Sequence, residues 1–144
     1  MSESEARPEV RAILGRDGYR VESAAGPFTI PSDMPEDAGG AGSAARPYEI
    51  LLAALGACGA MTMKSYAERK GWPLEGVEIA MRHERRKAEP GDPAANPAGW
   101  VFIIHHDVRL IGDELTDEQR ERLLSMAEVC PVKQSLTHGV RFEG

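Results

Sequence analysis

The chain has 144 residues, 42% of them hydrophobic, and carries a net charge of −6. A chain of this length buries about 68–70% of its unfolded surface, so it can form a core without metals or disulfides. The acidic balance excludes a general nucleic-acid binder, which needs a basic surface, and argues against an anchor on anionic membranes. The first ten residues lack the apolar core of a secretory signal, which predicts a cytoplasmic location. We expect a loose segment over residues 1–9 and one domain over residues 10–144.

The N-terminal part predicts three short strands. Residues 10–14, 19–23 and 27–30 combine β-branched and aromatic side chains, and turns that contain glycine separate them. This pattern predicts an antiparallel meander. Residues 31–45 are dense in Pro, Gly and Asp and predict a loop without regular structure. Long loops in compact domains are often functional.

The strongest predicted element is a helix from about Pro47 to Lys70. Pro47 suits the first turn, and Glu49 suits the positive end of the helix dipole. No charged residue occurs between Ile50 and Met63, so we expect a buried helix. This uncharged stretch is shorter than the roughly 20 residues that cross a bilayer, which indicates the core of a soluble protein.

The second half predicts a hairpin followed by helices. Residues 77–85 alternate between apolar and polar side chains, and residues 100–110 are β-branched and aromatic, so the two runs should pair. Thr116 to Gln119 fit a capping box, which begins a helix that ends near Val129.

The chain should end with a short helix and one strand. Pro131 can open a helix that runs to about Thr137, and residues 140–143 read as a last strand. No βαβ unit repeats along the chain. The order of elements therefore predicts an α+β fold with a meandering antiparallel sheet.

Cys58 and Cys130 are the only cysteines. They are too few for a disulfide framework or a structural zinc site, and a reducing cytosol favours a bond between them that forms and breaks during function. Either cysteine alone is more often an inert, buried side chain. Reactivity requires a neighbouring cation, because burial by itself raises the pKa of a thiol.

Glu49 and Cys58 cannot easily meet within one straight helix. At about 100° and 1.5 Å per residue, they lie on opposite sides and about 13 Å apart along the axis. If both belong to one site, either the helix bends near Gly56 or the glutamate comes from a second copy of the chain.

The four histidines do not predict a metal site. His105 and His106 are adjacent on a strand and point to opposite faces, while His83 and His138 lie in other elements. HExxH and CxxC motifs are absent from the sequence. A cysteine hydrolase that pairs Cys58 with His105 or His106 remains an alternative, and it needs an imidazole within hydrogen-bonding reach of the sulfur.

Two cysteine motifs carry a resemblance to a known family. Residues 47–58, with the Met61-Thr62 and Tyr66-Ala67 pairs that follow, resemble the central helix of the OsmC/Ohr family, and Cys130-Pro131-Val132 resembles its second cysteine motif. The Gly39-Gly40 loop and residues 115–120 also fit the family pattern. The similarity covers nearly the whole chain from Val10 onward. One departure is Lys133-Gln134, where relatives often carry a His-Arg pair, and another is Asp33-Met34-Pro35 before the Gly-Gly loop.

The resemblance implies a fold, an assembly and a set of site residues. Members of the family are intertwined homodimers with two sites at the subunit interface, and they use no cofactor. Cys58 corresponds to the peroxidatic cysteine and Cys130 to the resolving one. Glu49 matches the glutamate that holds an arginine beside the reactive sulfur. Arg16 is our candidate for that arginine, with Arg20 and Arg46 as alternatives.

The resemblance also implies an activity. Cys58 would reduce an organic hydroperoxide to an alcohol, and its sulfenic acid would condense with Cys130 to a disulfide. An external dithiol, of the lipoyl type or another small kind, would reduce that disulfide. The apolar surroundings of Cys58 favour organic or fatty hydroperoxides over hydrogen peroxide. The remaining alternative is a small-molecule-binding stress protein of the same fold, with weak or lost peroxidase activity.

Overall fold

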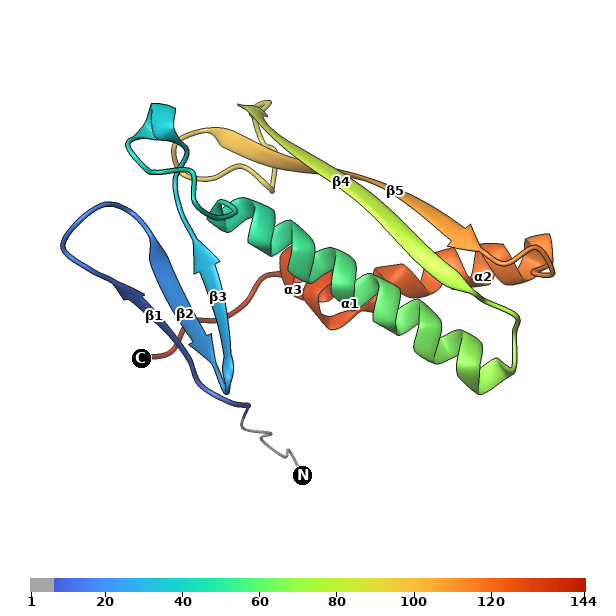
Figure 1. Cartoon of the computed structure of the whole chain (residues 1–144). Helices are drawn as coiled ribbons and strands as arrows, with labels where there is room; N and C mark the ends of the chain where they lie inside the picture. The colour runs from blue at the N-terminus through green and yellow to red at the C-terminus, as the bar shows by residue number, and fades with distance from the viewer. Residues whose placement is uncertain (1–6) are drawn as a thin grey trace. The chain divides into compact units, whose positions relative to one another are not determined.

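The structure is a computed structural model that describes residues 7–144 (Figure 1). The chain forms two compact units, one up to Leu51 and the other over Leu52–Gly144, and each is described by itself. Residues 1–6 of the predicted loose segment lie outside the described residues, and residues 7–9 have no regular structure. The division into a loose start and one domain stays a prediction.

The first unit contains the predicted meander. Strands β1 (Val10–Leu14), β2 (Val21–Ala25) and β3 (Phe28–Ser32) pair antiparallel in the order β1-β2-β3, with Ser23 opposite both Ala12 and Ile30. The meander is confirmed. Strand β2 begins two residues later than predicted, because residues 16–19 bend through Gly18 at a φ of 75°.

The loop after β3 is more ordered than predicted. Strand β3 continues to Ser32, and a 3-10 turn, η1 (Glu36–Ala38), follows, so the expectation of no regular structure over 31–45 is wrong at these places. The carboxylate of Asp33, only 2% exposed, accepts hydrogen bonds from the Ser43 hydroxyl at 2.6 Å, the Ser43 N–H at 3.1 Å and the Met34 N–H at 2.7 Å. One buried carboxylate thus ties the two ends of the loop together.

Helix α1 (Pro47–Lys70) has the predicted bounds. Its buried residues form a single stripe at helical spacing: Leu52, Gly56, Gly59, Met63 and Ala67. The prediction of a core helix is confirmed by this stripe, while Met61 on another face of the helix is 70% exposed in the single chain. By length and composition alone α1 could cross a membrane, and it is the one such helix among the described residues.

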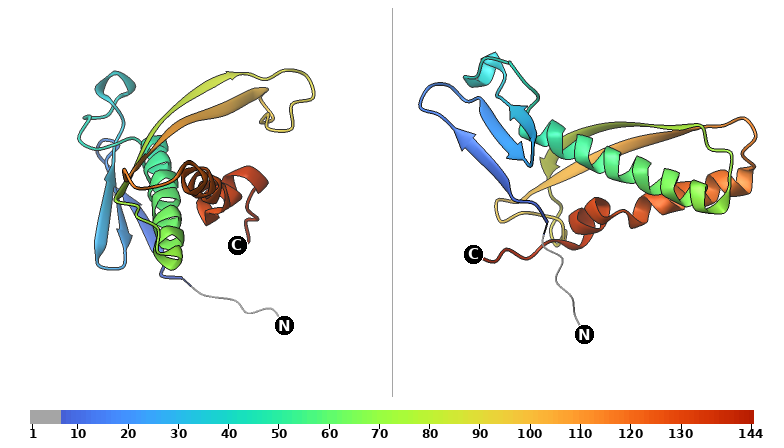
Figure 2. Two further views of the ribbon diagram at one scale, coloured as in Figure 1. Left: turned by 90° about the vertical axis from the view of Figure 1, so that its right-hand side faces the viewer. Right: turned by 60° about the horizontal axis from the view of Figure 1, so that its bottom comes forward.

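The second unit builds its core from α1, a hairpin and helix α2. Strands β4 (Gly76–Lys87) and β5 (Trp100–Ile111) pair antiparallel over their whole length, as predicted, with Met81 opposite His106. Figures 1 and 2 show this hairpin and α2 running beside α1. The buried core cluster joins these elements and the loop before α2: Met63, Ala67, Leu110, Leu115 and Leu123.

Both C-terminal helices begin where the Thr116/Gln119 capping box and Pro131 predict. Helix α2 (Asp117–Met126) starts with the Thr116/Gln119 capping box and continues into a 3-10 turn, η2 (Ala127–Val129). Helix α3 (Pro131–His138) follows, and Gly139 ends it at a φ of 89°.

The predicted last strand over residues 140–143 does not form. These residues have no regular structure, and Val140 and Phe142 are 60% and 91% exposed. Alternating apolar residues become a strand only where a neighbouring strand accepts their hydrogen bonds. In the described residues no strand takes up that position.

Candidate active site

Cys58 lies on the middle of α1 and is partly exposed. Its backbone carbonyl accepts a hydrogen bond from the Thr62 hydroxyl at 2.8 Å. The side chain borders a surface hollow of about 300 Å³ that follows one face of the helix and is lined by Cys58, Met61, Thr62, Ser65 and Arg69. A reagent in solution can therefore reach this sulfur.

Cys130 occupies the junction between η2 and α3 and is 0% exposed. It is the N-cap residue of α3, with an extended backbone at φ −65° and ψ 143°, and Pro131 takes the first helical position. Its Sγ accepts a hydrogen bond from the Lys133 backbone N–H at 3.3 Å. The proline that fixes the helix start therefore also fixes a sulfur at the positive end of that helix.

The two thiols, far apart in the sequence, meet in the second unit. Both are free, and Cys130 interacts with the side chain of Cys58. Burial is the main cause that raises the pKa of Cys130, and the hydrogen bond and charge of Cys58 raise it further. The backbone N–H groups of Lys133 and Val132 act in the opposite direction, because they stabilise a thiolate. A partly exposed thiol beside a buried thiol that caps a helix is an arrangement suited to reversible disulfide exchange.

Glu49 pairs with Arg46, one of the arginines that the sequence left open. Its Oε1 accepts hydrogen bonds from the Arg46 side-chain Nε and backbone N–H, each at 3.0 Å. Arg20 instead binds Glu22 at 2.8 Å and the Ser43 hydroxyl at 2.9 Å.

Arg16, our candidate arginine, lies exposed in the turn between β1 and β2. Within residues 7–144 no ion pair joins it to Glu49. Its role, and those of Glu49 and the two cysteines, stay predictions.

His105 and His106 lie on β5, and the His106 side chain lines the apolar cavity between α1, the hairpin and the segment around Cys130. His105 bonds Glu84 at 3.0 Å on the hairpin. Among residues 7–144 no hydrogen bond joins either His105 or His106 to Cys58, so nothing supports the hydrolase pairing. In the same part of the chain no group of three or more His, Cys, Asp or Glu side chains could hold a metal.

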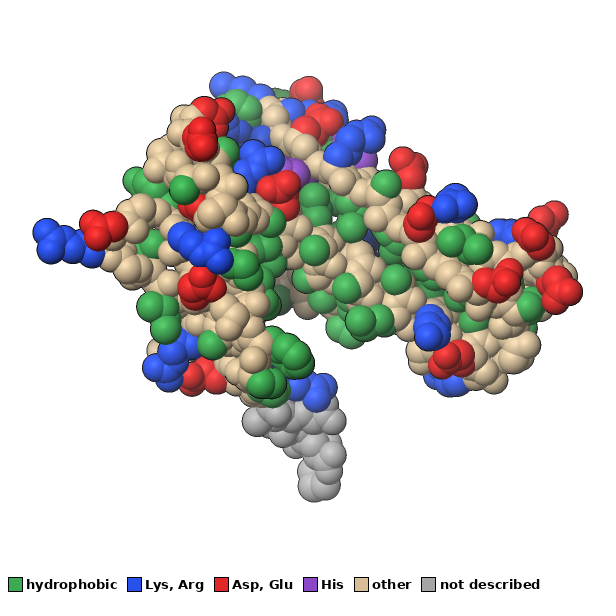
Figure 3. All heavy atoms as spheres, in the orientation of Figure 1, with side chains coloured by type: hydrophobic (Ala, Val, Ile, Leu, Met, Phe, Trp, Pro, Cys, Tyr) green, Lys and Arg blue, Asp and Glu red, His purple; other side chains and the backbone are tan. Residues whose placement is uncertain are grey.

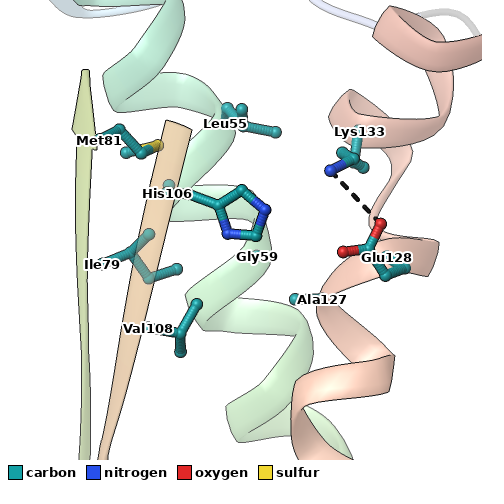
Figure 4. A pocket seen from close by; sticks show the side chains of 10 residues that line it. Leu55, Gly59, Ile79, Met81, His106, Val108, Ala127, Glu128 and Lys133 are labelled. Atoms are coloured by element: carbon teal, nitrogen blue, oxygen red, sulfur yellow. Dashed lines mark ion pairs between the residues drawn. The ribbon is translucent and has the colours of Figure 1, made fainter. Parts of the chain in front are cut away.

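A small apolar cavity lies beside the segment that contains Cys130 (Figure 4). It has room for about 30 Å³, and α1 and the hairpin supply its apolar wall: Leu55, Gly56, Gly59, Ile79, Met81 and Val108. On the other side Lys133 and Glu128 form an ion pair at 3.3 Å. Lys133 was not among the predicted site residues, although its position directly after the second cysteine motif was a signal.

Comparison with known proteins agrees with the resemblance. The profile of the family described as OsmC-like protein matches residues 40–143. A search of curated proteins finds no match.

Solved structures share the fold. The organic hydroperoxide resistance protein OsmC of Legionella pneumophila has a TM-score of 0.67 at 24% identity, over 93% of this chain and 91% of that one. The OsmC-like protein of Mycoplasma pneumoniae has a TM-score of 0.68 at 16% identity, over 93% and 89%. The organic hydroperoxide resistance protein OhrB of Bacillus subtilis has a TM-score of 0.59 at 22% identity, over 90% of each chain. With its central helix, hairpin and two meeting cysteines, the chain belongs to the OsmC-like protein family.

Proposed function

We propose that this protein is a cysteine-based peroxidase that reduces organic hydroperoxides to alcohols. One observation carries the proposal: the partly exposed thiol of Cys58 meets the fully buried thiol of Cys130. Two of the similar solved structures are named organic hydroperoxide resistance proteins, which supports the proposal. The exposed Met61 side chain, which lines the same hollow as Cys58, offers apolar surface to the alkyl group of an organic hydroperoxide.

Activation of Cys58 needs a cation beside the sulfur. We propose that an arginine stabilises the thiolate of Cys58 and that Glu49 orients the guanidinium through a charge-assisted pair. Arg16 is the candidate from the resemblance. Arg46 is supported by the pair it already forms with Glu49 at 3.0 Å.

The oxidation step breaks the O–O bond of the hydroperoxide. The Cys58 thiolate attacks the terminal oxygen, and the alkoxide leaves and takes up a proton to become the alcohol. Cys58 is oxidised by two electrons to the sulfenic acid, and the hydroperoxide is reduced by the same two. The Cys130 thiol then attacks the Cys58 sulfur, a disulfide forms, and water leaves.

The next step returns both sulfurs to thiols. An external dithiol attacks one sulfur, and the other leaves as a thiolate. We propose attack on Cys58, because Cys130 is 0% exposed whereas Cys58 is partly exposed and borders a surface hollow. The dithiol ends as its own disulfide, which balances the two electrons. A monothiol should accordingly form a trapped mixed disulfide on Cys58 and not on Cys130.

We further propose that the working unit is an intertwined homodimer in the cytoplasm. Figure 3 shows hydrophobic side chains spread over the face of α1 turned to the viewer, and Met61 on this helix is 70% exposed. A second copy of the chain could cover such apolar side chains, and it could supply Glu49 to a Cys58 that its own helix keeps away. Sedimentation velocity should give the mass of two chains, and a stable, well-folded monomer would oppose this part of the proposal.

Intact-mass spectrometry tests the activity. After one equivalent of cumene hydroperoxide the wild type should lose two hydrogens, while Cys130→Ser should gain one oxygen. Cys58→Ser is the matched control and should do neither. With a dithiol present, turnover that survives in Cys58→Ser would refute the proposal. Stoichiometric ligand binding with no sulfenic acid in Cys130→Ser would favour the small-molecule-binding alternative.

A further inference from the structure

Three cations gather around one tyrosine where α1 ends. The guanidinium carbons of Arg122 and Arg69 lie 5.4 and 5.6 Å from the centre of the Tyr66 ring, and the Lys70 ammonium lies 5.6 Å from it. Arg122 also donates from Nε to the Tyr66 hydroxyl at 3.0 Å. Two of these cations belong to the last turn of α1, and Arg122 belongs to α2.

None of the three cations pairs with a carboxylate among residues 7–144. Elsewhere in this acidic chain arginines do pair: Arg46 with Glu49 at 3.0 Å, and Arg109 with Glu78. The positive field at Tyr66 is therefore not neutralised by the protein itself. The lowered pKa of Tyr66 agrees, with the Arg122 hydrogen bond as its largest cause and the charges of Arg122, Lys70 and Arg69 adding to it.

A surface hollow of about 550 Å³ opens beside this cluster. Trp72 and Tyr66 line it and meet edge to face, with ring centres 5.4 Å apart and planes at 70°. Lys70 and Arg122 also line it. The first turn of α2 completes the rim with polar groups: Thr116, Glu118 and Gln119. Glu118 is the only carboxylate in this lining.

We propose that this hollow binds a small organic anion that carries a planar ring, and the first probe is a mononucleotide, a phosphate ester with an aromatic base. Trp72 and Tyr66 offer ring surfaces, and a guanidinium that uses only Nε within the protein keeps its two terminal amino groups for an anionic oxygen pair. Glu118 and Gln119 supply polar groups for the hydroxyls of such a ligand.

A purely structural role explains only part of the cluster. Cations in the last turn of a helix complement its dipole, which accounts for Arg69 and Lys70. It does not account for Arg122, which reaches Tyr66 from a different helix. The site also lacks both cysteines, because Cys58 borders a different hollow, so it goes beyond the proposed peroxidase activity.

Fluorescence of Trp72 gives a direct test. Trp72 and Trp100 are the only tryptophans, so Trp100→Phe leaves Trp72 as the single reporter. Adenosine 5′-monophosphate should quench it saturably, while adenosine and inorganic phosphate should bind about tenfold or more weakly. Calorimetry on the wild type with the same three probes gives the affinities without any substitution.

Variants locate the site. Arg122→Gln and Lys70→Gln should each weaken the binding of adenosine 5′-monophosphate about tenfold, and Arg109→Gln is the matched control that should not change it. Circular dichroism checks that each variant folds. The inference is overturned if the wild type shows no binding of adenosine 5′-monophosphate, if adenosine or phosphate binds equally well, or if Arg122→Gln and Lys70→Gln both bind as the wild type does. Because Cys58→Ser should leave this binding unchanged, its result is separable from that of the peroxidase test.

Discussion

Two glycines one turn apart on α1 allow a sharp test of how the helix packs on the hairpin. Gly56 and Gly59 both belong to the buried stripe. A Cβ on Gly56 would lie 2.5 Å from Cε of Met81, whereas a Cβ on Gly59 would lie 3.5 Å from Cδ1 of Ile79, an ordinary contact. Substitution by alanine therefore produces a steric clash at Gly56 and an ordinary van der Waals contact at Gly59.

Each substitution changes the free energy of unfolding through helix propensity, and only Gly56→Ala also changes it through a steric clash. Replacing a helical glycine by alanine gains about 1 kcal/mol at either position. At Gly56 the terminal methyl group of Met81 must also move, and because it is the end of a flexible side chain this costs less than the roughly 1–3 kcal/mol of overpacking a rigid core. We therefore expect Gly59→Ala to stabilise the protein by up to about 1 kcal/mol, and Gly56→Ala to be less stable than Gly59→Ala by up to about 1 kcal/mol.

Urea denaturation followed by circular dichroism measures this difference. All chains should be compared at one protein concentration, because a dimer's stability depends on it. The double variant Gly56→Ala with Met81→Ala, set against Met81→Ala alone, should recover the helix gain by removing the obstructing atoms. If Gly56→Ala stabilises the protein as much as Gly59→Ala does, the packing of α1 on β4 described above is wrong.

Three further predictions concern stability. Leu123→Ala, at a side chain that is 0% exposed, should cost about 2–5 kcal/mol in urea denaturation, while its neighbour Leu124→Ala, 43% exposed, should cost clearly less. Thr116→Ala removes the capping box and should lower the unfolding free energy by about 1 kcal/mol; no change would mean that α2 does not depend on its cap. The pKa of Asp33 is lowered in the fold, mainly by the Ser43 hydroxyl, so its carboxylate stabilises the protein above the unfolded pKa of about 3.9 and that contribution is lost as the pH falls through the folded pKa. Asp33→Asn should therefore lower the melting temperature at pH 7, and the gap to wild type should narrow below about pH 4; a gap independent of pH would contradict this.

Most elements could be predicted because their signals are local. The bounds of α1 follow from Pro47, an uncharged stretch and a basic end, and the start of α2 follows from the Thr116/Gln119 capping box. The hairpin follows from two runs with a strand pattern, joined by one polar loop. Each signal acts between residues close in the sequence, so no tertiary contact is needed to recognise it.

The prediction of a last strand was wrong because a strand depends on a partner that is not local in the sequence. Residues 140–143 have the right alternation, but a strand exists only with a neighbour, and the alternation does not say where that neighbour lies. The core position of α1 was predicted correctly from its run without charges. Only the packing shows which stripe of the helix this chain covers.

The sequence by itself determined the elements of the fold, the family resemblance and the two cysteines as candidates. Only the tertiary structure decided that the thiol of Cys58 meets Cys130, that Cys130 caps α3, and that Arg122 reaches Tyr66 from another helix. These contacts join segments far apart in the chain. Their existence depends on how whole elements pack, which no local pattern of residues records.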